Sequence, residues 1–307
     1  MRRSVVVCVV SGVAMVFLGD WFGCSRRRTR KMLARFPSAT RLRPTARRRA
    51  LSTLVDLAAY PINRLDSHEG QLLLRHCHKQ LSEQGFVALS GFLTPAAVAA
   101  MLDEAKSLSA ENGFYSTESH NVFLEEGMPD DLPESHPRRV IQSSSKLLFA
   151  ADQLSSHSPL REVYEWPPLL EFIRAALQRP QLHLSVDPMA SHYLNIFSVG
   201  DQLGWHFDNS EFSVSLVLQP SVEGGAFEFA PASRDAVSAQ CAFEPDALDV
   251  RRPPLHAGSL YLFHGRDSLH RVSEVRQGER INAILAYNTD GSILNEYTRR
   301  KFFGRDL

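Results

Sequence analysis

The residues best suited to chemistry are two histidines and one aspartate in the last third of the chain. His206 and Asp208 are separated by a single residue, so on a β-strand both side chains would point to the same face. A third candidate ligand, His270, opens a later apolar segment. Two imidazoles and one carboxylate form the facial triad that suits Fe(II) and leaves three coordination positions open. The sequence therefore predicts an iron site.

Arg280 is a candidate for binding a carboxylate close to this metal. It follows His270 by ten residues, just past a turn, on a strand expected to pair with the His270 strand. A guanidinium can form two parallel hydrogen bonds with a carboxylate. Asn282 lies two residues further along, on the same strand face, and offers another donor. The alternative is a solvated charge at a hairpin end, or one paired with Glu279, as most such charges are.

A compact β region must position these residues. From residue 191 onward the apolar residues recur at every second position, as over 212–219, which is the pattern of half-buried strands. About seven short strands are predicted within one hundred residues, including a hairpin of 269–275 with 279–287, and this spacing is typical of a sandwich or a barrel. The segment 231–257 is predicted to be an insert between two strands.

Helical patterns precede the β region. Residues 71–84 form the first, which Gly85 is predicted to end as a C-cap. Thr94-Pro95 starts a second with Thr94 as its N-cap, and Pro167-Pro168 starts a third. The polar residues 113–160 are predicted to be a long loop region that borders the site. Helices followed by a compact β unit indicate one α+β domain.

Four consecutive blocks resemble the Fe(II)/2-oxoglutarate-dependent dioxygenases: GWHFD (204–208), GSLYLFH (258–264), LHRV (269–272) and GERIN (278–282). The resemblance covers roughly residues 56–307 and is strongest over 191–288. It implies a double-stranded β-helix, a jelly-roll or cupin-like barrel with N-terminal supporting helices. It also implies that His206, Asp208 and His270 bind iron, while Arg280, with Asn282 beside it, binds the distal carboxylate of 2-oxoglutarate.

The resemblance further implies an oxidoreductase that takes Fe(II) as cofactor and 2-oxoglutarate and O2 as co-substrates. Such an enzyme hydroxylates an unactivated C–H bond of a small molecule and releases succinate and CO2. The segments YEWPP (164–168), SEF (210–212) and FFGR (302–305) resemble a subgroup related to free-amino-acid hydroxylases and halogenases, so a free amino acid is one candidate substrate. Halogenases of this superfamily carry a small residue in place of the carboxylate ligand, and Asp208 therefore predicts hydroxylation without halogenation.

Two other functions remain open at this point. One is a non-catalytic metal-binding β-helix protein that acts as a sensor or interaction module, and the other is a hydroxylase of protein side chains. Substrate contacts are predicted in the 113–145 loop and beside the metal motif, with solvated surface residues as the alternative; the candidates are Asn121, Arg138, Arg139, Trp205 and Glu211.

The first 55 residues differ sharply from the rest. They carry 13 Lys and Arg against one acid, Asp20, for a net charge of +12, which leaves 21 basic and 33 acidic residues in 56–307, a net charge of −12. A net charge of −12 over residues 56–307 should repel phosphate backbones, which argues against a nucleic-acid partner. Only Cys77 and Cys241 lie in the body, and nothing in the sequence pairs them in a disulfide.

The basic segment is predicted to be a targeting leader rather than part of the fold. Its apolar stretch, Val5 to Gly19, is typical of a signal-peptide core and short for a membrane span of about 20 residues. The acid-free remainder, rich in Arg, Ser and Thr, is typical of a mitochondrial or plastid transit peptide. Translation from Met32 would give a mitochondrial presequence, and the secretory route or a signal anchor are further alternatives. We expect no stable membrane span in the mature form.

Overall fold

The computed structural model describes residues 53–125, 127, 129–289 and 293–307. The described helices are α2 (His68–Gln84), α3 (Pro95–Ser107), α4 (Pro159–Tyr164), α5 (Pro167–Ala176), α6 (Arg234–Ser238) and α7 (Glu296–Phe303). The strands are β1 (Phe86–Leu89), β2 (Phe114–His120), β3 (Gln142–Phe149), β4 (His183–Leu184), β5 (His192–Phe197), β6 (Leu203–His206), β7 (Ser213–Gln219), β8 (Glu223–Gly224), β9 (Phe227–Ala230), β10 (Leu260–Phe263), β11 (Leu269–Val272), β12 (Val275–Gln277), β13 (Arg280–Leu285) and β14 (Tyr287–Asn288).

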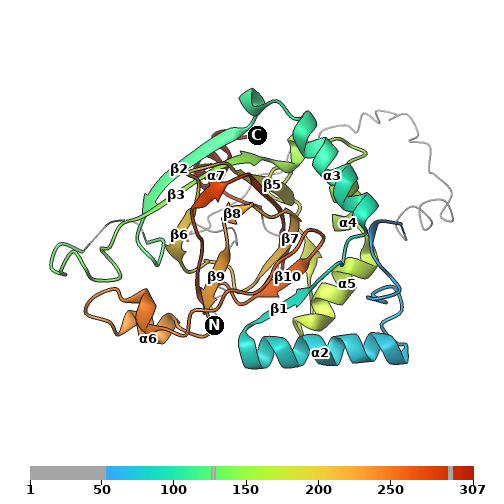
Figure 1. The fold of residues 1–307 in the computed structure, drawn as a ribbon, viewed down its shortest axis with the longest axis horizontal. Coiled ribbons are helices and arrows are strands. Elements are labelled where there is room, and N and C mark those ends of the chain that lie inside the picture. Colours follow the sequence, from blue (N-terminus) through green and yellow to red (C-terminus); the bar gives the residue numbers. More distant parts are fainter. Residues whose placement is uncertain (1–52, 126, 128, 290–292) are drawn as a thin grey trace, which may run out of the picture.

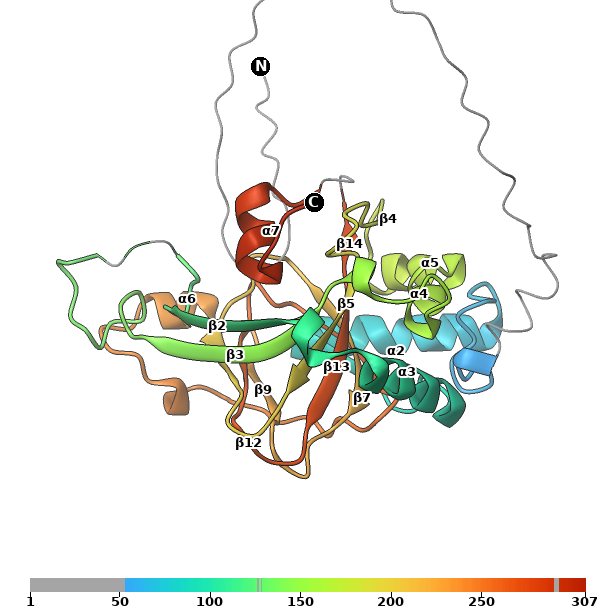
Figure 2. The same cartoon turned by 90° about the horizontal axis from the view of Figure 1, so that it is seen from above.

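The predicted end of the first helix and the predicted starts of the next two are confirmed, whereas the first helix begins at His68, three residues before its predicted start. Gly85 ends α2 in the left-handed conformation at φ 64°, where glycine carries no Cβ penalty. The Thr94 side chain accepts a hydrogen bond from the backbone N–H of Ala97 and so begins α3. The Pro167-Pro168 pair begins α5, as the sequence predicted. These helices, with α4, lie together on one side of the strands (Figures 1 and 2).

Two antiparallel sheets contain most of the strands, and two further two-stranded sheets pair β12 with β8 and β14 with β4. The major sheet has seven strands in the order β1-β10-β7-β13-β5-β3-β2, and the minor sheet has three in the order β6-β11-β9. Figure 1 shows the minor-sheet strands β6 and β9 facing the major-sheet strands β7 and β10. Together with the helices, this is the mixed helix and sheet architecture that the sequence predicted.

Strand alternation divides the major sheet into two faces. On β13, Ile281 and Ala283 belong to the main hydrophobic core, which packs against α2, α3, α4 and α5. Arg280, Asn282 and Ile284, at the alternate positions, line a pocket on the opposite face. One strand thus contributes both to stability and to a polar site, because neighbouring side chains point to opposite faces.

Two sequence predictions about this region are wrong. Residues 113–160 are not a long loop, because β2 and β3 pair along their whole lengths and extend the major sheet through β5; their polar composition fits the sheet edge, where one face is solvated. In addition, the segments 269–275 and 279–287 do not form a hairpin. β11 pairs with β6 and β9 in the minor sheet, whereas β13 pairs with β5 and β7 in the major sheet.

The packed chain also begins earlier than the predicted boundary at Asp56. Val55 is fully buried and bridges to Leu93, and the backbone N–H of Thr94 donates to the carbonyl oxygen of Leu54. The predicted leader falls almost entirely on residues 1–52, which lie outside the described residues. Within the described part of the chain, no helix is both long and apolar enough to cross a membrane.

Candidate active site

The structure brings the three predicted metal ligands together. His206 on β6 and His270 on β11 are direct cross-strand partners. The sequence predicted that Asp208 lies on the same strand as His206, but β6 ends at His206 and Asp208 follows it. The Asp208 Oδ1 atom lies 3.6 Å from Nε2 of His206 and 3.5 Å from Nε2 of His270. All three side chains are buried. One ligand atom from each lies within 4.8 Å of the others, which is the spacing that a single ion requires.

Backbone carbonyls orient both imidazoles. Nδ1 of His206 lies 2.8 Å from the carbonyl oxygen of Gly204, and Nδ1 of His270 lies 2.9 Å from that of Ser268. Because a carbonyl oxygen only accepts hydrogen bonds, each Nδ1 carries the proton and each Nε2 presents its lone pair to the common centre. Burial, with His270 next to it, lowers the pKa of His206, which favours the neutral form that binds a metal.

The Asp208 carboxylate is fixed by a hydrogen bond and by the close approach of Gly265. Ser213 Oγ donates a hydrogen bond to Oδ2 at 2.5 Å, and the backbone N–H of Asp208 donates to the carbonyl oxygen of Gly265. A Cβ at Gly265 would lie 2.2 Å from Oδ2, so only glycine allows this approach. Burial raises the pKa of Asp208, but His270 and His206 lower it by more, and the carboxyl is held well below its usual pKa. A carboxylate beside two imidazoles whose Nε2 atoms face it is a donor set that fits Fe(II).

Arg280 faces the same pocket from the opposite sheet. Arg280 is only 2% exposed, and its Nε and Nη2 atoms have no hydrogen-bond partner among the residues that the structure describes. Leaving buried N–H groups unpaired costs about 1–3 kcal/mol each, so a buried guanidinium with two free donors indicates a missing anionic partner. Nε and Nη2 form one edge of the planar guanidinium, which matches the two oxygens of a carboxylate. The arrangement thus fits a ligand with a carboxylate.

The pocket lies between the two sheets and is lined mainly by the inward faces of their strands. Asn282 lies on the pocket face two residues from Arg280 and is the cross-strand partner of Asn195, which also lines the pocket. Sequence reasoning missed Asn195 and Tyr193, although the alternation of residues 192–197 places both on one strand face. It also missed Lys146, because β3 was interpreted as a loop.

None of the five predicted substrate residues lines this pocket. Asn121 holds its own loop, since its side chain bonds the backbones of Arg138, Phe123 and Glu125. The others are engaged elsewhere: Arg138 pairs with Glu125, Arg139 donates to the carbonyl of Leu132, Trp205 lies under the Arg271 guanidinium, and Glu211 pairs with Arg179. These side chains stabilise loops and sheet edges instead of facing the triad.

Comparisons with known proteins found one family match and several similar solved structures. A family model described as HalD, Halogenase D, matches residues 69–302, about three quarters of the chain. No curated protein matches. Among solved structures, the non-haem α-ketoglutarate-dependent epimerase SnoN from nogalamycin biosynthesis aligns with a TM-score of 0.50 at 18% identity, covering 71% of this chain and 83% of its own. At that identity the likeness concerns the fold alone.

Two further solved structures align with slightly lower scores. A 2OG-Fe(II) oxygenase family protein from Burkholderia pseudomallei has a TM-score of 0.48 at 15% identity and covers 72% of this chain and 92% of its own. AviO1 from Streptomyces viridochromogenes Tue57 has a TM-score of 0.48 at 15% identity and covers 71% and 96%.

The fold, the His-Asp-His cluster and the family match define a member of the Fe(II)/2-oxoglutarate-dependent oxygenases, a superfamily of oxidoreductases. This confirms the resemblance carried by the four sequence blocks. Within that class, the chain belongs to the Halogenase D family.

Proposed function

We propose that this protein hydroxylates an unactivated C–H bond of a small molecule, consuming 2-oxoglutarate and O2 and releasing succinate and CO2. The observation that carries the proposal is the presence, in one pocket, of a complete buried triad and a buried arginine with two unpaired donors. A non-catalytic metal protein would not need the second feature, because metal binding alone leaves no role for an unpaired guanidinium.

Each residue has a distinct part in this proposal. His206, Asp208 and His270 would hold Fe(II) through two nitrogens and one oxygen, and Arg280 would bind the distal carboxylate of 2-oxoglutarate, with Asn282 beside it. When bound, the metal and its co-substrate supply the oxidising power for breaking the C–H bond. The protein's own contribution would be to orient the metal ligands, hold the distal carboxylate of the co-substrate and exclude water from the buried pocket.

We also propose that the reaction ends in hydroxylation rather than halogenation, despite the name of the family. The carboxylate of Asp208 lies close to both imidazoles. Ser213 donates a hydrogen bond to it, and the missing Cβ of Gly265 leaves room for it. A halide would need the coordination position of this carboxylate to be vacant. With Asp208 as the third protein ligand, the place that a resident chloride would need beside the two imidazoles would already be filled.

For the fold and the leader we propose two finer points. The two facing sheets, with a site between them, fit the two halves of a double-stranded β-helix, and residues 56–307 would form this one domain. The basic residues 1–55 would direct the chain to a mitochondrion or plastid, the secretory route being the alternative. Fusing 1–55 to a fluorescent protein and locating it by microscopy tests the second point; a diffuse cytosolic signal would contradict it.

The decisive test of function is stoichiometric. Purified protein with Fe(II) and 2-oxoglutarate in air should form succinate, and a screen of free amino acids should identify one that gains the mass of one oxygen atom per succinate. Protein that binds Fe(II) but never forms succinate would favour the sensor reading. Succinate formation stimulated only by peptides or proteins would favour a side-chain hydroxylase.

A further inference from the structure

Lys146 on β3 is a second cation in the wall of the pocket, and the roles assigned above leave it unused. Its side chain is half-buried, and its ammonium lies 6.0 Å from the ring of Phe302. Across the described residues, no carboxylate lies within the 4.0 Å of an ion pair with it. The acid close by, Glu118, is 3.9 Å from Lys301 instead. A cation that faces a pocket without a partner is available to a ligand.

Strand register places Lys146 apart from Arg280 on the same wall. Leu147 pairs with Ile196, so Lys146 stands beside Phe197, and Phe197 pairs with Arg280. Lys146, Phe197 and Arg280 all line the pocket, in a row across three neighbouring strands. Strands lie about 4.8 Å apart, so the backbones of Lys146 and Arg280 are separated by roughly 10 Å. The two cations are therefore suited to two different carboxylates.

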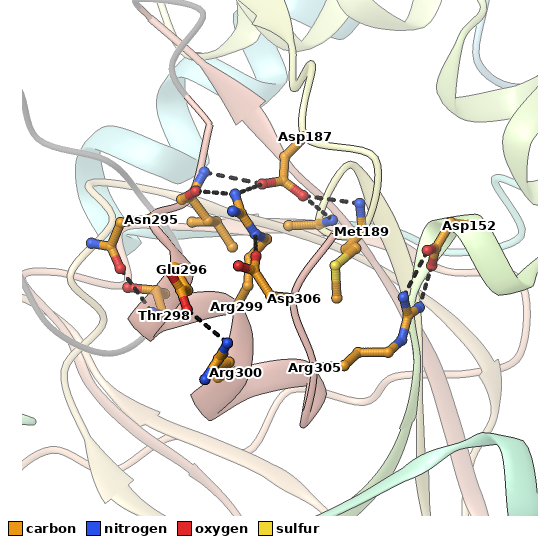
Figure 3. A network of polar contacts seen from close by, with 12 residues as sticks. Asp152, Asp187, Met189, Asn295, Glu296, Thr298, Arg299, Arg300, Arg305 and Asp306 are labelled. Atoms are coloured by element: carbon orange, nitrogen blue, oxygen red, sulfur yellow. Dashed lines mark hydrogen bonds and ion pairs between the residues drawn. The ribbon is translucent and has the colours of Figure 1, made fainter.

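The surroundings of Lys146 are held in place by the C-terminal helix. Arg299 on α7 lies 3.7 Å from Asp187 and 2.5 Å from Asp306, and Arg305 forms a two-point contact with Asp152 (Figure 3). These contacts tie α7 to the body. Phe302 on the same helix packs with Leu148 and Tyr193 and lines the pocket next to Lys146. The position of the Phe302 ring beside the Lys146 side chain is therefore fixed by these contacts.

The charges of the loaded pocket do not balance without another anion. Lys146 and Arg280 are positive and Asp208 is negative, while Fe(II) would add two positive charges and 2-oxoglutarate two negative ones. One positive charge remains. Burial lowers the pKa of Lys146, with Glu118 and Asp208 opposing the shift, which means that the ammonium gains from any additional negative partner. A buried or half-buried net charge is costly until it is paired.

We propose that Lys146 binds the carboxylate of the primary substrate and so orients the C–H bond to be hydroxylated. This inference rests on the proposed function and narrows it to substrates that carry a monoanionic group. Among the described residues that line the pocket, Lys146 and Arg280 are the only lysine and arginine. With Arg280 assigned to the co-substrate, the single ammonium of Lys146 suits a carboxylate better than a phosphate dianion, which is normally held by several donors. Lys146 thereby determines specificity, while Arg280 serves the co-substrate.

The experiment compares acids with their amides. The Fe(II) protein is loaded with 2-oxoglutarate under argon, and the metal-to-ligand absorption is followed while free amino acids, 2-hydroxy acids or the matching carboxamides are added. In the wild type, at least one acid should perturb the band at concentrations about 10- to 100-fold below its amide, since a charge-assisted contact is lost in the amide. Lys146→Met should abolish this preference, and Lys146→Arg should retain part of it.

Lys106→Met is the matched control, because Lys106 is an exposed lysine on α3 outside the pocket lining, and it should keep the wild-type preference. Equal binding of acid and amide by the wild type, no response to any acid, or an undiminished preference in Lys146→Met would each overturn the inference. So would a loss of 2-oxoglutarate affinity in Lys146→Met equal to that in Arg280→Met, because Lys146 would then serve the co-substrate. A wild type without any 2-oxoglutarate response would instead refute the proposed function itself.

Discussion

Replacing Arg280 with methionine separates a binding role from a structural one. The two unpaired donors of Arg280 would bind one carboxylate of 2-oxoglutarate, and such a charge-assisted pair contributes about 2–4 kcal/mol. Since about 1.4 kcal/mol is a factor of ten, the dissociation constant for 2-oxoglutarate should rise about 30- to 1,000-fold. Arg280→Lys should lie between, because an ammonium keeps the charge but loses the two-point geometry.

The same substitution should not weaken the unloaded protein. Arg280 is 2% exposed and carries two unsatisfied nitrogens, so removing the guanidinium relieves a cost of about 1–3 kcal/mol for each of them. The Tm of the metal-loaded variant without 2-oxoglutarate should therefore equal or exceed that of the wild type by a few degrees.

Thermal unfolding of the Fe(II) protein under argon measures both effects. At 2-oxoglutarate equal to 100 times the wild-type dissociation constant, the wild type should gain about 2.7 kcal/mol of stability and the variant less than about 1 kcal/mol. Iron content should be unchanged, because Arg280 does not touch the triad. A variant that is less stable without ligand, yet retains the full 2-oxoglutarate shift, would show that Arg280 supports the fold and that the carboxylate binds elsewhere.

Four other perturbations test the remaining reasoning. His270→Ala removes one nitrogen ligand and should abolish both Fe(II) retention and succinate release; near-full activity would reject the ligand assignment. In chloride buffer the wild type should give only hydroxylated product, and any chlorinated product would refute the role given to Asp208. Burial lowers the pKa of His192 to about 3, so the unfolded chain binds this proton more readily than the folded chain. The free energy of unfolding should therefore fall as the pH drops from about 6.5 toward 3, by about 2 kcal/mol between pH 7 and pH 5. Urea unfolding at several pH values measures this slope, and His192→Phe should flatten it. Removing residues 1–52 should leave Tm and activity intact, whereas insoluble protein would mean that the leader packs on the domain.

Local signals in the sequence were enough to place helix ends and metal ligands. Ser, Thr, Pro and Gly at helix termini act through their own backbone and side chain, which is why the caps at Thr94 and Gly85 agree with the structure. His206 and His270 could be identified because so few residue types bind iron. That they are cross-strand partners could not be read from the sequence, since 64 residues separate them.

What failed was the pairing of strands and everything that depended on it. The alternation within a strand predicts which face each side chain lies on, but it does not predict which other strand pairs with it. For this reason β11 and β13 were predicted to form one hairpin, although they belong to different sheets. The polar strands β2 and β3 lack the apolar alternation of a half-buried strand, and with them Lys146 was lost from the site. Among the substrate candidates, Arg138 was predicted from the 113–145 loop and Glu211 from its place beside the metal motif, and neither lines the pocket that the two sheets form.

Because His206 and His270 are cross-strand partners, a metal bound by both would also stabilise the fold. An ion bound by both closes a loop of 64 residues in the chain, much as a covalent staple would, and a covalent link of that length removes unfolded-state entropy equivalent to about 4 kcal/mol. Metal binding and resistance to unfolding are thereby linked. The lifetime of the protein in its compartment should then follow the local supply of iron, and chelator-treated protein should be cut by a protease markedly faster than the iron-loaded form.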